Sequence, residues 1–211
     1  MRFAHDTAPD WIASVHPDRL GEALRPLVPT SHDLCAMLAM PRLRGAIVQV
    51  LARRFALAYP ENDGVRAEAD RAVMGLPVAQ WEALPVACGI ALWRHAIVNE
   101  IRQPQRQRLQ TELGDDVFAR AIDYVETLPA LSRASMGDPS AAAVRRDGHA
   151  CVAAWVAEQP AGWAGWLALK SSASGTGAAH ALQATVQPEW ADIVRPVAAA
   201  LALTTPDIHH E

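Results

Sequence analysis

The sequence predicts an all-α fold, an irregular multi-helix bundle, and three observations lead to this prediction. Apolar residues recur at helical spacing in one segment after another, prolines and glycines stand where helices begin and end, and strand signals are nearly absent. The chain has 211 residues, 51% hydrophobic and 20% charged, which is the balance of a chain that buries a core. Because no internal repeat is visible, we expect helices that cross at irregular angles.

Helix signals begin close to the N-terminus. Pro17 follows His16 at a position that suits the first residue of a helix, and Thr30 or Ser31 can cap a second, short helix. A stronger helix is predicted from Pro41, because apolar residues follow it at helical spacing. These residues are Leu43, Ile47, Val50, Leu51 and Phe55.

The middle of the chain contains the most apolar segment. A short helix over 65–74 is predicted to end at Gly75 in a left-handed cap, and Pro77 to open one more turn. Pro85 is predicted to begin the most apolar helix. Because apolar residues cover nearly its whole circumference, we expect this helix to lie at the centre of the bundle.

Two further helices are predicted on either side of Gly114. This glycine is expected to end the helical segment 106–113, and Asp115 to cap the helix that follows. The second helix would bury one apolar stripe. That stripe consists of Val117, Phe118, Ala121, Ile122 and Val125.

The predicted domain organisation has three parts. Residues 1–130 form the main helical domain, 131–141 a linker or long loop, and 142–211 a C-terminal helical subdomain whose packing on the first domain stays open. Asp138 followed by Pro139 is typical of a helix start. In the C-terminal part, apolar periodicity predicts a helix that ends near Pro160, another with Trp163, Trp166 and Leu169, and a last one over 190–203.

Charge and hydropathy narrow the functional classes. The net charge of −4 argues against a dedicated nucleic-acid binder, which would be basic. The N-terminus lacks the apolar stretch of a signal peptide. The longest charge-free apolar stretches, 84–93 and 196–203, are shorter than the roughly 20 residues that cross a bilayer. We therefore expect a cytoplasmic or peripheral protein.

Several motifs contain reactive residue types without the context that chemistry needs. Cys35, Cys88 and Cys151 are widely spaced among apolar residues, which indicates buried free thiols rather than a metal or redox site. Residues 31–33 read Ser-His-Asp, but triads assemble from distant segments rather than neighbours. Residues 175–177 read Gly-Thr-Gly, but no strand precedes them as in a dinucleotide-binding loop. No metal or cofactor is expected.

Two groups of residues are candidates for partner binding. Arg102, Arg106 and Arg108 lie among glutamines in a polar basic segment. It could face phosphate, anionic lipid or, as we favour, an acidic partner surface, with a solvated helix face as the alternative. Trp155, Trp163 and Trp166 crowd one region, as at interface hot spots, with core packing as the alternative.

Two other functions remain open on the residues alone. An all-α enzyme could use His95 together with acidic residues around Gly114, although a hydrogen-bonded, half-buried histidine is the simpler interpretation. A helical regulator could bind nucleic acid through the three arginines. The acidic residues are Glu112, Asp115, Asp116, Asp123 and Glu126.

Several segments, read together, resemble a known family. They are Trp-Ile-Ala-Ser-Val-His-Pro-Asp-Arg-Leu at 11–20, Leu-Pro-Val-Ala-Cys-Gly-Ile-Ala-Leu-Trp at 84–93 running into Arg94 and Ile97, and Leu-Gly-Asp-Asp-Val-Phe-Ala at 113–119. This pattern resembles the SctK family of type III secretion sorting-platform proteins, which includes YscK, PscK, MxiK, OrgA and the Hrp-system equivalents. The resemblance covers residues 11 to 126.

The resemblance implies a helical cytoplasmic adaptor without enzymatic activity. Such an adaptor would link the cytoplasmic domain of the inner-membrane ring protein SctD to the SctQ pods of the injectisome, a virulence apparatus for protein transport. Its location would be the cytoplasmic face of the inner membrane, reached through its partners. It would need no cofactor.

Overall fold

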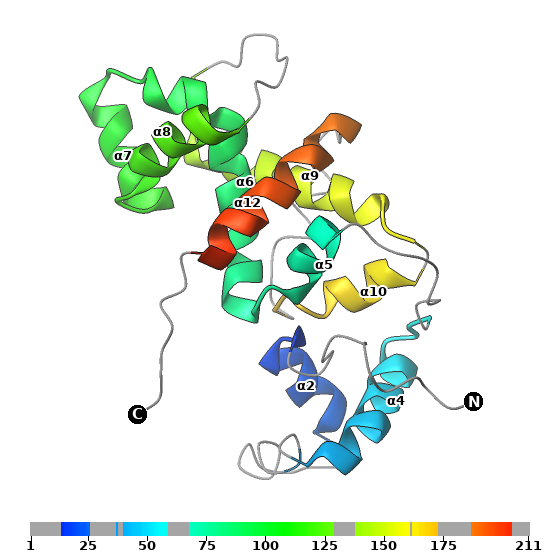
Figure 1. The fold of residues 1–211 in the computed structure, drawn as a ribbon. Helices are drawn as coiled ribbons and strands as arrows, with labels where there is room; N and C mark the ends of the chain where they lie inside the picture. The colour runs from blue at the N-terminus through cyan, green and yellow to red at the C-terminus, as the bar shows by residue number, and fades with distance from the viewer. Residues whose placement is uncertain are drawn as a thin grey trace, which may run out of the picture.

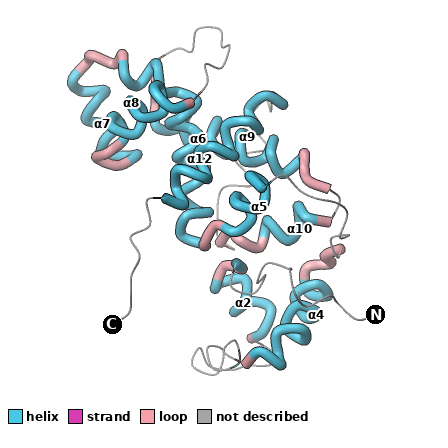
Figure 2. The backbone as a smooth tube through the Cα atoms, in the orientation of Figure 1, coloured by secondary structure: helices cyan, strands magenta, loops and turns pink. Residues whose placement is uncertain are grey.

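A computed structural model describes residues 14–25, 37, 40–58, 68–128, 138–160, 162–172 and 187–203. All regular structure in these ranges is helical, and no strand occurs in them (Figure 2). The predicted all-α, multi-helix fold is confirmed. The predicted helix near Thr30, the residues 31–33, Cys35, most of the predicted linker and the residues 175–177 lie outside the described ranges.

The N-terminal unit, which we define as residues 14–25 and 40–58, contains α2 (Pro17–Leu24) and α4 (Arg44–Arg54). Pro17 occupies the start of α2 as predicted, and the His16 Nδ1 accepts a hydrogen bond of 3.1 Å from the Asp18 N–H. Such a bond satisfies one of the free N–H groups at a helix start. A short 3₁₀ turn, η1 (Pro41–Leu43), leads into α4, so this helix begins at the predicted proline.

The central apolar segment is one helix, not two. α5 (Glu68–Gly75) ends at Gly75, which is not left-handed, so the predicted glycine cap was wrong. α6 (Val78–Val98) runs through Pro85 in its interior, so the prediction that a new helix begins there was also wrong. Pro85 lies in the second turn of α6, where the ring removes a single backbone hydrogen bond. The predicted central position of this helix is confirmed, because it is packed on several sides (Figure 1).

α7 (Gln103–Leu113) and α8 (Val117–Thr127) form a helical hairpin around Gly114. Gly114 ends α7 with φ 111°, a conformation that L side chains rarely adopt, so the predicted terminator is confirmed. The residue at the start of α8 is Asp116, one position later than predicted. Ile122 is not part of the buried stripe, because 47% of its surface is exposed.

The C-terminal helices are α9 (Ala141–Ala157), α10 (Trp163–Ala168) and α12 (Ala191–Leu203), the last preceded by the 3₁₀ turn η2 (Pro188–Trp190). The cap of α9 is Ser140, whose Oγ accepts a hydrogen bond of 3.2 Å from the Ala143 N–H. The predicted start at Asp138 was therefore two residues early. A serine is as good a cap as an aspartate, and the sequence offers both within three positions.

α6 and α9 cross at close range, through two glycines. A Cβ added to Gly148 of α9 would lie 1.8 Å from the backbone oxygen of Pro85, and one added to Gly89 of α6 would lie 2.0 Å from that of Val144. Only residues without a side chain let the two backbones approach so closely. Nearby, the Trp93 indole N–H donates a hydrogen bond of 3.0 Å to the buried Asp147.

The buried residues form two hydrophobic cores. The larger core combines α5 to α9 with η2, α12 and one side of α10, so helices on both sides of the predicted linker share it. The smaller core consists of α2 and α4 together with Trp166 and Leu169. The N-terminal unit therefore packs around a separate, smaller core that the α10 segment completes, whereas α9 and α12 pack directly on the central helix α6.

The α10 segment, residues 162–172, joins the two cores. Trp163 and Leu167 contribute to the larger core, and Trp166 and Leu169 to the smaller one. Polar contacts reinforce this junction. The Trp166 indole N–H donates to the Ala58 oxygen at 2.9 Å, and the His16 N–H donates to the Leu169 oxygen at 2.8 Å.

Candidate partner-binding surface

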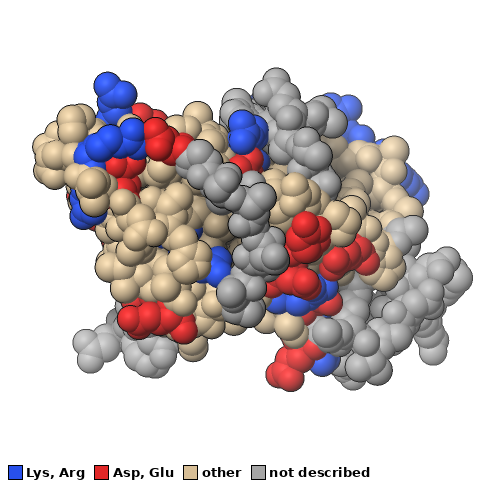
Figure 3. All heavy atoms as spheres, turned by 90° about the horizontal axis from the view of Figure 1, so that it is seen from above, with Lys and Arg blue, Asp and Glu red and all other residues tan. Residues whose placement is uncertain are grey.

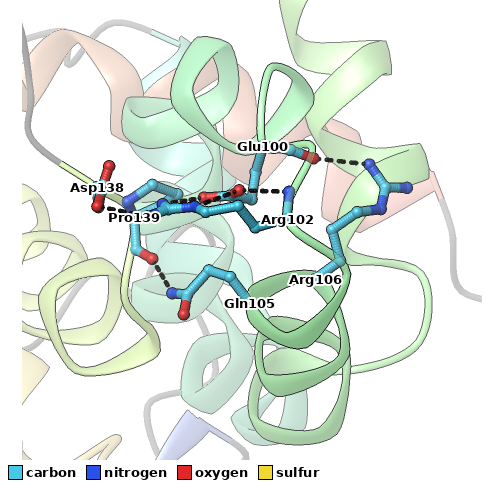
Figure 4. Close-up of polar contacts among 6 residues, drawn as sticks. All are labelled: Glu100, Arg102, Gln105, Arg106, Asp138 and Pro139. Carbon is cyan, nitrogen blue, oxygen red and sulfur yellow. Dashed lines mark hydrogen bonds and ion pairs between the residues drawn. The ribbon is translucent and has the colours of Figure 1, made fainter.

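The basic segment predicted to bind a partner begins at a sharp corner between α6 and α7. Glu100 lies in this corner with 4% of its side chain exposed, and it accepts three hydrogen bonds from Arg102. They come from the backbone N–H at 2.8 Å, from Nε at 2.9 Å and from Nη2 at 2.5 Å (Figure 4). The remaining Nη1 of Arg102 reaches Asp138, just before α9, at 2.8 Å.

Two further residues of α7 fasten the same corner. Arg106 donates to the backbone oxygen of Glu100 at 3.1 Å, and its guanidinium lies 3.9 Å from the ring centroid of Phe118 on α8. Gln105 donates to the backbone oxygen of Pro139 (Figure 4). The α6–α7 corner, defined as these residues with Glu100, Arg102 and Asp138, therefore fixes the hairpin to both α6 and α9.

These contacts change the acidity of the corner groups. Hydrogen bonds from the Arg102 side chain and backbone, with the charges of Arg102 and Arg106, lower the pKa of Glu100 to about 2, against the effect of burial. Hydrogen bonds to Glu100 and Asp138 raise the pKa of Arg102 above its ordinary value. Arg102 and Arg106 therefore hold the corner, and groups within the chain largely compensate their positive charges.

The outer side of α7 is the part of the basic segment that faces solvent. Arg108 is exposed and forms no ion pair with a described residue, and Ile101, at the start of the hairpin, is 88% exposed. Basic and acidic side chains lie in small mixed groups over the face seen in Figure 3, rather than in one field of a single sign. Ile101 and Arg108 are thus an exposed apolar and an exposed cationic side chain that this segment offers to a protein partner.

The three tryptophans predicted for partner binding lie in the interior. Their exposed fractions are 0% for Trp155, 8% for Trp163 and 2% for Trp166. The Trp155 indole N–H donates to Asp70 at 2.8 Å, and Asp70 also binds Arg195 of α12 at 2.8 Å. A partner surface needs exposed side chains, so their place in this structure corrects the prediction in favour of the alternative, core packing.

His95 and the acidic residues near Gly114 are not joined into one site. His95 is exposed on the last turn of α6, not half-buried as expected, and no hydrogen bond or ion pair links it to those acids. Asp116 pairs with Arg120 within α8. In the ranges that the structure describes, no group of three or more His, Cys, Asp or Glu residues could hold a metal ion.

Sequence reasoning missed a buried cation, Lys170. Its side chain is fully buried at the end of the α10 segment, and its Nζ donates to the backbone oxygens of Met74 at 2.6 Å and Leu76 at 2.8 Å. It also lies 5.4 Å from the ring centroid of Trp81. Lysine near a helix end satisfies free carbonyls. Its status as the only lysine was visible in the sequence, but its partners lie more than 90 residues away.

Two of the three cysteines fall in described residues. Cys88 on α6 and Cys151 on α9 are free and buried, which confirms the prediction for these two. Burial and the neighbouring Cys151 raise the pKa of Cys88 well above its ordinary value. A thiol with a raised pKa is a poor nucleophile and a poor metal ligand, so Cys88 is a packing residue.

Comparisons of this chain with protein-family models, with curated proteins and with solved structures found no match. Within the described ranges no single helix has the length and apolar character to span a membrane, although α5 and α6, bent by 115° to one another, meet the length and composition criteria as a pair.

Proposed function

We propose that this chain is a non-enzymatic adaptor of a bacterial type III secretion injectisome, linking the cytoplasmic domain of SctD to the SctQ pods of the sorting platform. The proposal starts from the resemblance of residues 11–126 to the SctK family. The all-α fold agrees with it, because that family is helical. Under this proposal, the protein is held at the cytoplasmic face of the inner membrane by its partners.

The observation that carries an adaptor role is the α7–α8 hairpin. It projects from one end of the bundle (Figure 1), and the α6–α7 corner fastens it by hydrogen bonds and ion pairs. A fixed projection with Ile101 and Arg108 exposed offers a preorganised surface, which lowers the entropic cost of binding a partner. We assign the partner contact to this outer side of α7.

Co-purification tests the proposal. Tagged full-length chain is expected to capture purified SctQ or the SctD cytoplasmic domain from the same type III system. Ile101→Asp and Arg108→Glu are expected to weaken that capture, because each changes an exposed side chain that makes none of the corner's hydrogen bonds. Arg71→Glu, an exposed change on α5, serves as the matched control and is expected to bind as the wild type does.

Two results would count against the proposal in different ways. Failure of the wild-type chain to bind either protein would reject the adaptor role. Binding by the wild type that Ile101→Asp and Arg108→Glu leave unchanged would reject the assigned surface and keep the role.

A further inference from the structure

The two ends of the molecule differ in charge. The N-terminal unit carries six arginines and two acidic residues, whereas the other described residues carry ten basic and fourteen acidic side chains. Between residues 40 and 58 there are four arginines and no acidic residue. The N-terminal unit is therefore basic, on a chain with a net charge of −4.

α4 presents a basic face with small residues in its middle. Helical spacing places one set of exposed residues along a single side of η1 and α4. An added Cβ at Gly45 would meet nothing within 4 Å, so the middle of this face is open. Among the described residues, Arg53 has no ion-pair partner, and the polar partner of Arg42 is the sulfur of Met40. The face, which we call the α4 face, consists of Arg42, Gly45, Ala46, Gln49 and Arg53.

α8 presents the opposite composition at the other end of the molecule. Its exposed side, with the turn before it, carries three carboxylates that pair with no basic residue in the described ranges. It also carries a large apolar side chain, Ile122, which is 47% exposed. Asp115 and Glu126 lie at the two ends of this side, and Ile122 and Asp123 lie between them. The face, which we call the α8 face, consists of Asp115, Ala119, Ile122, Asp123 and Glu126.

The two faces match in spacing when the helices run antiparallel. Setting Ile122 opposite Ala46 places Glu126 opposite Arg42, four residues away, and Asp115 opposite Arg53, seven residues away. At about 1.5 Å per residue, Ile122 to Glu126 spans roughly 6 Å along α8 and Ala46 to Arg53 roughly 10 Å along α4. Arg42 lies in η1, and Asp115 lies in the turn before α8. The isoleucine then lies over Gly45 and Ala46, where small side chains allow a close approach.

The two faces cannot meet within one molecule, because α4 and α8 lie at opposite ends of it with the central bundle between them (Figure 1). We propose that the α4 face of one copy docks on the α8 face of a second copy. Such a contact joins two different surfaces, so each added copy leaves one face of each kind open. The chain would therefore form head-to-tail rings or open chains, independently of any secretion partner.

Salt dependence is the first test. Surface ion pairs are individually weak, so we expect weak association. The Debye length is roughly 30 Å at about 10 mM salt and roughly 3 Å at about 1 M. Sedimentation of the full chain at millimolar concentration should show a mass above the 22.7 kDa monomer in low salt and the monomer mass in high salt. A monomer at both salt concentrations, or an oligomer that high salt leaves intact, would overturn the proposal.

Charge exchange is the second test. The double variant Arg42→Glu with Arg53→Glu makes the α4 face acidic like the α8 face. The double variant Asp115→Arg with Glu126→Arg makes the α8 face basic like the α4 face. Each alone should lose association by at least about tenfold, and their equimolar mixture should recover it, because every contact in the mixture again pairs opposite charges. The recovery also shows that both variants are folded. Variants that still associate alone, or a mixture that stays monomeric while the wild type associates, would exclude this pairing.

A matched control separates this surface from overall charge and from the proposed partner site. Arg71→Glu with Arg108→Glu changes the net charge by the same amount as the α4 variant, and it should associate as the wild type does. Loss of association in this control would show that net charge, not the α4 face, is responsible. Vesicles with phosphatidylserine are the other probe: binding that requires Arg42 and Arg53, with no self-association, would assign the α4 face to a membrane and overturn the proposal.

Discussion

At the scale of single residues, Lys170 shows how the fold uses a buried charge. Its ammonium group donates to carbonyls at the end of α5 and in the turn that leads to α6, and so connects the α10 segment to the larger core. Burial lowers the pKa of Lys170 to about 8. A cation held in an apolar interior costs free energy unless its hydrogen bonds compensate, which the two carbonyl contacts do in part.

The lowered pKa predicts a specific pH dependence of stability. Between about pH 8 and the ordinary lysine value of 10.5, the unfolded chain binds a proton that the folded chain has lost, so the free energy of unfolding rises with pH. The shift corresponds to about 3 kcal/mol. Urea unfolding of the wild type and of Lys170→Met should be measured at neutral pH and near pH 10.5. Between these two pH values, the free energy of unfolding of the wild type should increase relative to that of the variant by up to that amount.

The difference between the two proteins is the quantity to measure, because Cys88 and Tyr124 also titrate in alkali and are present in both. Burial raises the pKa of Tyr124 to about 12, and that of Cys88 is raised as well, so both groups lower the stability of each protein as pH rises. A constant difference across the pH range would mean that Lys170 keeps its ordinary pKa in the folded chain.

At the scale of helices, the sequence predicted where segments are helical better than where they end. The helical spacing of apolar residues is repeated over many positions, so α4, α6 and α9 can be recognised even where one predicted end is wrong. A helix end depends on one or two local contacts. Both Asp138 and Ser140 are residue types that cap helices. In the structure Ser140 caps α9, and Asp138 accepts a hydrogen bond from Arg102, which lies 36 residues earlier.

The candidate site was predictable only in part, for the same reason. The basic segment was recognisable from its composition, but the corner that occupies Arg102 and Arg106 depends on Glu100, Phe118 and Asp138 being brought together by the fold. The tryptophans were recognisable as a group, and their burial follows from the packing of α9 and α10, which composition does not report.

The crossing of α6 and α9 depends on its two glycines. Gly148→Ala would place a methyl group against the backbone oxygen of Pro85, which cannot rotate away, so the helices must separate. We expect the free energy of unfolding to fall by about 3 kcal/mol, measured by urea denaturation. Gly21→Ala in α2 is the control, because its added Cβ meets nothing within 4 Å. There, helix propensity should raise stability by about 0.5 to 1 kcal/mol. Equal effects of the two changes would contradict close backbone packing at Gly148.

The α6–α7 corner predicts an acid-sensitive contribution to stability. Because the pKa of Glu100 is lowered to about 2 in the folded chain, its carboxylate stabilises the fold above the ordinary value of 4.5, and this contribution is lost as pH falls from 4.5 toward 2. Glu100→Gln keeps the shape but not the charge. Unfolding at pH 6 and at pH 3 should show the wild type more stable than the variant at the higher pH, with the gap closing in acid. A difference in the free energy of unfolding that is the same at both pH values would show that the charge of Glu100 does not contribute to stability.

At the scale of the whole molecule, the two cores imply two levels of stability. The N-terminal unit has the smaller core and depends on Trp166 and Leu169, supplied from the far end of the chain by the α10 segment. The larger core is built around α6 and closed by α9 and α12. A region with fewer buried apolar contacts opens at a lower free energy than the rest.

Hydrogen exchange with matched tryptophan variants tests this division. In the wild type, amides of α2 and α4 should exchange faster than those of α6 and α9. Trp166→Ala removes a side chain from the smaller core, so it should accelerate exchange in α2 and α4 while α6 stays protected. Trp155→Ala opens a cavity in the larger core and should lower global stability by about 3 to 5 kcal/mol, accelerating exchange in α6 and α9 as well. If Trp166→Ala released every helix equally, the molecule would unfold as one unit, and the N-terminal unit would not be separable from the bundle on which it docks.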